Sequence, residues 1–231
     1  MGTEASLDDL PPLAPATRVA DAVYMALREA IVDYRLKAGT PLNVPALARR
    51  FNVSRSPVRE AVQQLRTEGL AEEQPWKGSV VVSIGREDAM DVHDMRGALE
   101  ALAARRAAAN AAEAELAAMA EVLERQAAAV GAHDAKGYAE TNKEFHRLLM
   151  RASAAPRLIR TLSHFYDLAQ VAIRQAAASA PGHIEQGLAE HRALLEAIRR
   201  REQDEAEALM RAHFARTRPV MASQDHERRI E

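Results

Sequence analysis

The stretch from Asn52 to Glu60 constrains the fold of this chain more than any other part of the sequence. It follows a segment over residues 44–51 whose apolar residues recur at helical spacing. Asn52 suits the left-handed backbone conformation of a tight turn, and Pro57 suits the first turn of a second helix. Two short helices joined by such a turn predict a helix-turn-helix.

Polar side chains gather near the start of the second helix of this motif. Ser54 or Ser56 can cap the helix, and Arg55 and Arg59 lie one turn apart. Between residues 49 and 66 the chain holds five Arg and one Glu, although the whole protein carries a net charge of −2. Paired guanidinium groups suit base edges in the major groove, and local positive charge suits phosphates. We predict a DNA-reading helix; the alternative is a helical domain with solvated arginines.

A β-hairpin is expected directly after this helix. Its strands are predicted at 71–74 and 79–84, and Trp76-Lys77-Gly78 forms the turn between them. A hairpin behind a helix-turn-helix is a wing, whose tip residues Lys77 and Gly78 can approach a phosphate or the minor groove. The order of turn, paired arginines and hairpin favours DNA binding over the solvated-surface alternative.

The rest of the chain shows no strand pattern. Three prolines make residues 1–15 an expected unstructured lead-in, and residues 16–85 are the winged helix-turn-helix domain. Turn signals cut the remainder into six helices, at about 87–110, 113–130, 134–152, 156–178, 182–200 and 203–222. With 49 Ala in 231 residues, the chain is predicted to be mostly α, with an antiparallel all-α bundle over 86–222 and a tail over 223–231.

Composition excludes several classes of site. The chain has no Cys, so disulfides, thiolate nucleophiles and cysteine-ligated zinc are excluded, and His and carboxylates remain as strong metal ligands. No stretch reaches the roughly 18 to 20 apolar residues that a membrane span needs, and no signal peptide is visible. We expect a soluble, cytoplasmic protein without a membrane partner.

Three histidines of the bundle are predicted to share its interior. His191 and His213 each lie 11 residues from a predicted turn at residue 202, so they face each other if their helices are antiparallel. Asn142 and His146 lie one turn apart on a helix face near the core. These four residues form a candidate site for a divalent metal ion such as zinc, nickel or manganese. The alternative is that each of the three His is a satisfied core residue. The other five His show no such alignment and are expected to be surface or structural residues.

The N-terminal residues resemble a known family. The run Val53 to Val62, within a match from about Arg18 to Ile84, looks like the DNA-binding domain of the GntR family of bacterial transcription regulators. The resemblance implies that Arg55 and Arg59 read operator bases and that Gly78, the wing glycine, contacts DNA.

The second half resembles the FCD ligand-binding domain of the FadR-type branch of that family. The stretches that carry this resemblance are Asp91 to Glu100, Asn142 to His146, Glu190-His191 and His213. It implies that a metal and a small carboxylate effector share one cavity, and that Asn142 stands where an Asp is common. Arg96 matches an Arg that would pair with the effector carboxylate. An equal alternative is a surface ion pair of Arg96 with Glu100, one turn further on.

These features predict a metabolite-responsive regulator that binds a palindromic DNA operator as a homodimer. The alanine-rich face over residues 101–120 is equally compatible with a dimer interface and with internal packing. Two alternatives come from other classes of protein. One is a metal-dependent enzyme with three His ligands, and the other is an architectural DNA-binding protein whose bundle only dimerises.

Overall fold

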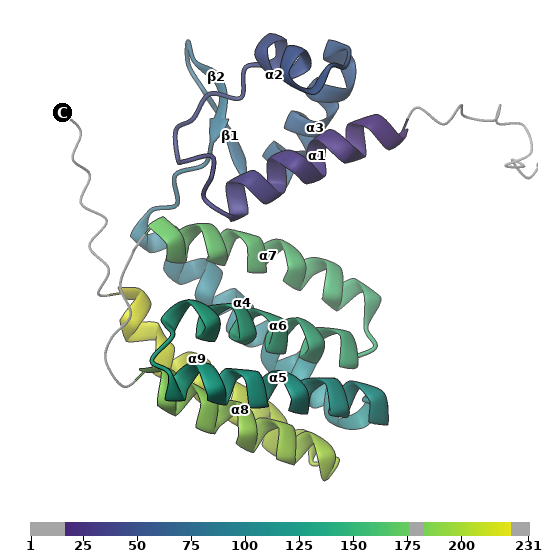
Figure 1. Cartoon of the computed structure of the whole chain (residues 1–231), viewed down its shortest axis with the longest axis vertical. Helices are drawn as coiled ribbons and strands as arrows, with labels where there is room; N and C mark the ends of the chain where they lie inside the picture. The colour runs from purple at the N-terminus through teal and green to yellow at the C-terminus, as the bar shows by residue number, and fades with distance from the viewer. Residues whose placement is uncertain (1–16, 176–182, 223–231) are drawn as a thin grey trace, which may run out of the picture. The chain divides into compact units, whose positions relative to one another are not determined.

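The computed structural model describes residues 17–175 and 183–222, and the chain divides between Ser83 and Ile84 into two units (Figure 1). The predicted lead-in over residues 1–15 and the predicted tail over 223–231 lie outside the described residues.

The N-terminal unit is a helix-turn-helix followed by a hairpin. Its elements are α1 (Thr17–Val32), α2 (Val44–Phe51), α3 (Arg55–Thr67), β1 (Ala71–Gln74) and β2 (Gly78–Val81). Asn52 closes α2 in the predicted left-handed conformation, with φ 55° and ψ 47°. Asn43 caps the start of α2, because its side-chain oxygen accepts from the backbone N–H of Ala46 at 2.9 Å. The predicted order of elements is confirmed, although the second strand ends at Val81 rather than residue 84.

The second strand of the hairpin is paired along both of its edges. β1 and β2 are antiparallel, with Ala71 opposite Val81 and Gln74 opposite Gly78. The loop before α2 runs along the other edge of β2, where the N–H of Leu42 donates to the carbonyl of Ser79 at 2.8 Å. Since both edges of β2 are paired, the wing has a defined position within its unit.

The C-terminal unit is a helical bundle. Its helices are α4 (Arg86–Asn110), α5 (Glu113–Gly131), α6 (Ala135–Ala152), α7 (Pro156–Gln175), α8 (His183–Arg199) and α9 (Gln203–Ala222). The starts and ends differ from the predicted ones by at most a residue or so, except that the end predicted for α7 (residue 178) and the start predicted for α8 (residue 182) lie outside the described residues. No helix of residues 17–175 and 183–222 is both long and apolar enough to cross a membrane.

Helix α4 is the central helix of this bundle and packs against α6, α7, α8 and α9 (Figure 1). α4 can pack against four helices because its alanines place small side chains on several faces, which lets the neighbouring helices approach closely. The fully buried ones are Ala101, Ala103, Ala104, Ala107 and Ala108. Of the two interpretations of the alanine-rich face, this part of it serves internal packing.

One glycine sets the crossing of α4 and α9. A Cβ added at Gly97 would lie 2.9 Å from Cγ of the Phe214 ring, which is itself buried. This contact brings α9, and with it His213, close to α4.

We expect Gly97→Ala to destabilise the protein, although alanine by itself favours a helix by about 1 kcal/mol. The added methyl group must displace the Phe214 ring, and overpacking of this kind costs about 1–3 kcal/mol. Thermal unfolding followed by circular dichroism measures the difference. Gly131→Ala is the matched control, because a Cβ there meets nothing within 4 Å. Equal or higher stability of Gly97→Ala would contradict the close crossing.

Candidate nucleic-acid interface and metal centre

The side chains predicted to read DNA are exposed at the start of α3. Ser54 occupies the N-cap position but its side chain makes no capping hydrogen bond, and the Ser56 hydroxyl donates to Oε1 of Glu60 at 3.3 Å. Arg55 and Arg59 are exposed, and neither forms an ion pair with another described residue. Two uncommitted guanidinium groups are therefore available to an external partner.

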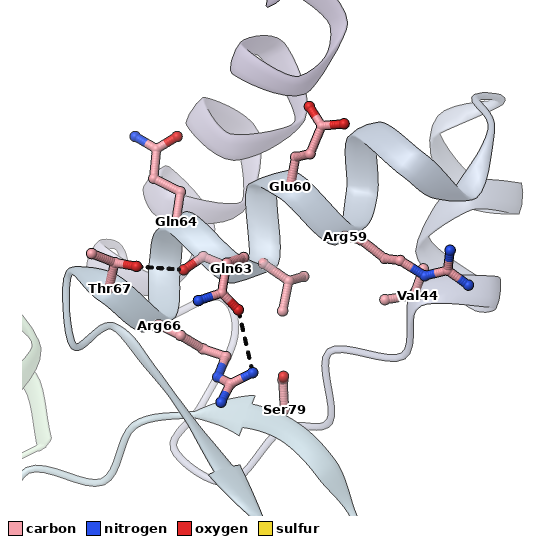
Figure 2. Close-up of a pocket in the computed structure, with 9 residues that line it drawn as sticks. Val44, Arg59, Glu60, Gln63, Gln64, Arg66, Thr67 and Ser79 are labelled. Atoms are coloured by element: carbon pink, nitrogen blue, oxygen red, sulfur yellow. Dashed lines mark hydrogen bonds between the residues drawn. The ribbon is translucent and has the colours of Figure 1, made fainter.

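A groove of about 720 Å³ lies between α3, the start of α2 and β2. Figure 2 shows Arg59 and Arg66 on the groove side of α3, with Gln63 between them. Arg59 extends toward Val44 and Arg66 toward Ser79, so a cationic group lies near each end (Figure 2). The other predicted DNA contacts do not line this groove.

Arg66, on α3, connects this helix to the wing through an ion pair. Its Nη1 lies 3.1 Å from Oε2 of Glu73 on β1, and it also donates to the Gln63 side chain at 3.4 Å. The Ser79 hydroxyl on β2 donates to the same Glu73 oxygen at 3.0 Å. One carboxylate thus joins the helix and both strands of the hairpin.

The predicted wing residues lie at the hairpin tip. Lys77 is exposed, and Gly78 opens β2 with φ 72°. A Cβ at Gly78 would meet nothing within 4 Å, so the backbone conformation and not space favours glycine there.

Three predicted histidines meet inside the C-terminal unit. His146 on α6, His191 on α8 and His213 on α9 have ring centroids 5.1 to 5.5 Å apart. One ring nitrogen of each lies within 4.8 Å of the others, and all three side chains are buried. The predicted facing of His191 and His213 across the α8–α9 pair is confirmed.

Each of these imidazoles is oriented by an oxygen acceptor through Nδ1. The pairs are His146 with Glu100 Oε2, His191 with Gln126 Oε1 at 2.9 Å, and His213 with Glu190 Oε2 at 2.7 Å. Since Nδ1–H donates in each pair, Nε2 keeps a lone pair. Nε2 of His191 is buried and has no hydrogen-bond partner among the described residues. An orphaned nitrogen beside two further imidazoles fits a metal ion.

Burial keeps the imidazoles of His146 and His191 neutral. It lowers the pKa of His146, and this outweighs the opposing influence of the Glu100 carboxylate. Burial, together with the neighbouring His146 and His213, holds the pKa of His191 well below its ordinary value. Neutral imidazole is the form that binds metal.

The two orienting carboxylates are ionised. Although burial alone raises the pKa of Glu100, the charge of Arg96 and the hydrogen bonds from His146 and Arg96 lower it to about 2. Burial also raises the pKa of Glu190, and hydrogen bonds from His213 and Arg216 lower it to about 2. Anionic acceptors strengthen imidazoles as ligands.

Arg96 is buried next to this cluster. Its Nε donates to Oε1 of Glu100 at 2.5 Å, and its guanidinium lies 4.4 Å from the ring centroid of Tyr166 and 5.2 Å from that of Phe214. The ion pair with Glu100 that we considered therefore exists, but in the interior and not at the surface, because α4 is the central helix.

Asn142 and His93 complete the set of residues considered in the C-terminal unit. Asn142 is half-buried one turn before His146, and its amide makes no hydrogen bond within the described residues. His93, expected to be surface or structural, is buried and its Nε2 lies 3.0 Å from the carbonyl oxygen of Phe214, so it is structural.

Sequence reasoning named Glu100 and Glu190 but did not recognise that they, together with Gln126, orient the histidines. Glu190 was detectable in this role, because it lies opposite His213 about the same turn that aligns His191. Gln126 was detectable as a single amide in the apolar face of α5, which also holds Val122 and Ala129.

Comparisons with known proteins agree with both units. The model of the bacterial regulatory proteins, gntR family, matches residues 19–81, and that of the FCD domain matches residues 91–216. The HTH-type transcriptional repressor RspR of Escherichia coli (strain K12) is 29% identical over 202 residues, 87% of this chain and 88% of that protein. The uncharacterized HTH-type transcriptional regulator YdhC of Bacillus subtilis (strain 168) is 31% identical over 193 residues, 83% of this chain and 85% of that protein.

Solved structures share the fold. The structure of E. coli McbR/YncC aligns with a TM-score of 0.75 at 20% identity, and the alignment covers 89% of this chain and 98% of that chain.

We expect Glu100→Ala to destabilise the C-terminal unit by about 3–5 kcal/mol, because it leaves the buried Arg96 charge without its partner. Glu100→Gln should cost less, since its amide oxygen still accepts from His146. Asp94→Ala is the control, because Asp94 pairs with Arg218 at the surface. Denaturant unfolding of the full chain measures all three. A loss for Glu100→Ala no larger than that for Asp94→Ala would show that the pair is not a structural element.

Proposed function

Because the chain belongs to the GntR family of bacterial regulatory proteins and carries an FCD domain, we propose that it is a metabolite-responsive, sequence-specific transcription regulator. Its relatives are transcriptional regulators and not enzymes. The observation that carries the proposal is the buried cluster of His146, His191 and His213. Each Nδ1 atom is hydrogen-bonded, and Nε2 of His191 has no hydrogen-bond partner among the described residues.

The N-terminal unit would bind one half-site of a palindromic DNA operator, and a homodimer would bind both. Arg55 and Arg59 would read guanine edges in the major groove, and Ser54 and Ser56 would contact the neighbouring backbone. In the wing, the tip residues 77–78 would approach a phosphate or the minor groove. The support is the exposure of these side chains and the freedom of both arginines from ion pairs.

The C-terminal unit would hold a divalent metal ion through His146, His191 and His213, with Asn142 as a weaker fourth ligand. Nitrogen ligands suit zinc, nickel or manganese. The ion would supply a positive centre for an anionic ligand. Glu100 and Glu190 would keep two of the imidazoles aligned and basic.

The effector would be a small carboxylate. Arg96 would share its guanidinium between Glu100 and the effector, because its planar fork offers five N–H donors. Tyr166 supports this proposal, since its ring lies beside the Arg96 guanidinium and its hydroxyl is buried without a hydrogen-bond partner among the described residues. Effector binding would change DNA affinity only if the effector binds the two arrangements of the dimer unequally.

The DNA part of the proposal predicts a sequence-dependent loss for Arg59→Ala. Affinity for a duplex selected by the wild-type protein from a random library should fall by about 1–3 kcal/mol, with a smaller loss on unrelated duplexes. Arg125→Ala, on α5 of the other unit, is the control. An equal loss on every sequence would reduce Arg59 to a phosphate contact.

The metal part predicts about one divalent ion per chain in protein purified without a histidine tag. His191→Ala should lose the ion, whereas His133→Ala should keep it, because His133 is exposed. Elemental analysis of the purified proteins decides this. Wild-type protein that is empty and also fails to take up added zinc, nickel or manganese would refute the metal centre.

A further inference from the structure

The tip of the wing carries an unusual apolar side chain. Trp76, the only tryptophan of the chain, is 102% exposed, whereas the next most exposed large apolar residue among those that the structure describes, Met25, is 54% exposed. Its backbone is left-handed, with φ 66°, a conformation that costs energy for a bulky residue. Burial of the indole against a partner would offset the cost of leaving it in water.

The indole is held at a defined place in the N-terminal unit. The N–H of Lys77 donates to the carbonyl of Gln74 at 3.2 Å and closes the turn. Arg66 and Glu73 join the hairpin to α3, so the tip has a set position relative to the DNA-reading helix. Trp76 therefore continues the DNA interface beyond the groove that α3 and β2 line.

Charge around the tip favours DNA as its partner. Lys77 is cationic and exposed, and the tip itself has no acidic residue. The two carboxylates nearest in the sequence lie on β1: Glu73 is paired with Arg66 and accepts from Ser79, and Glu72 accepts from the Gln74 amide at 2.9 Å. An aromatic ring beside a lysine suits the sugar and phosphate walls of a DNA groove.

We propose that the Trp76 indole enters the minor groove next to the major-groove site of α3 and favours A·T pairs there. One DNA strand would then pass between α3 and the wing, along Arg59 and Arg66. Minor-groove proteins insert apolar side chains in this way, and the indole N–H can donate to A N3 or T O2. A G·C pair places the guanine 2-amino group in the groove, where it would obstruct the ring.

The inference rests on the proposed DNA binding, and fluorescence tests it directly because Trp76 is the only indole. The probe is the duplex that the wild-type protein selects from a random library. On saturation with it, Trp76 emission should shift and become protected from acrylamide.

Substitutions distinguish insertion of the Trp76 indole into the minor groove from simple proximity of the indole to DNA. Trp76→Ala should lower affinity about tenfold, Trp76→Phe should retain most of it, and Met25→Ala should change nothing. G·C pairs under the wing should weaken the wild type about tenfold, and inosine·C pairs, which lack the 2-amino group, should restore it. Trp76→Ala should not distinguish these three duplexes.

Two results would overturn the inference without touching the proposed function. One is tight, specific binding with Trp76 emission and quenching unchanged. The other is an emission shift that follows protein concentration in the absence of DNA, which would place the indole in a protein contact. Wild-type protein that selects no duplex would instead refute the proposed function itself.

Discussion

The Glu100 carboxylate is fully buried in the C-terminal bundle, where it binds Arg96 on its own helix and His146 on α6. Loss of these partners would leave a buried charge uncompensated, which costs several kcal/mol. Glu100 therefore holds Arg96 and His146 in one arrangement with itself. The other two histidines are also oriented by a side-chain oxygen from a neighbouring residue: Gln126 orients His191, and Glu190 orients His213. The histidines are therefore preorganised by neighbouring helices and do not depend on a bound ligand for their orientation.

The charges around the cluster explain why an anionic effector fits the proposal. Glu100 and Glu190 are balanced by Arg96 and Arg216, and the imidazoles of His146 and His191 are kept neutral by burial. A divalent ion added to this set would leave excess positive charge in the interior. A small carboxylate would neutralise part of that charge, which links the metal and the effector through electrostatics.

Local signals predicted much of the fold. Asn52 and Pro57 located the helix-turn-helix, and the equal distances of His191 and His213 from one turn aligned them, because local chemistry and helix geometry decide these features. Sequence left open whether the alanines of α4 pack internally. The ion pair of Arg96 with Glu100, one of two equal alternatives, was expected at the surface and is buried, because burial on several faces depends on the neighbours of α4 and not on its own pattern.

The most direct test of the account is the affinity of the full chain for its selected duplex, with and without zinc and with and without each of a panel of small carboxylic acids. The account predicts that at least one acid changes the affinity about fivefold or more, and only when the metal is bound. Unchanged affinity under every condition would contradict it. The bundle would then be a dimerisation module, and its histidines would be structural.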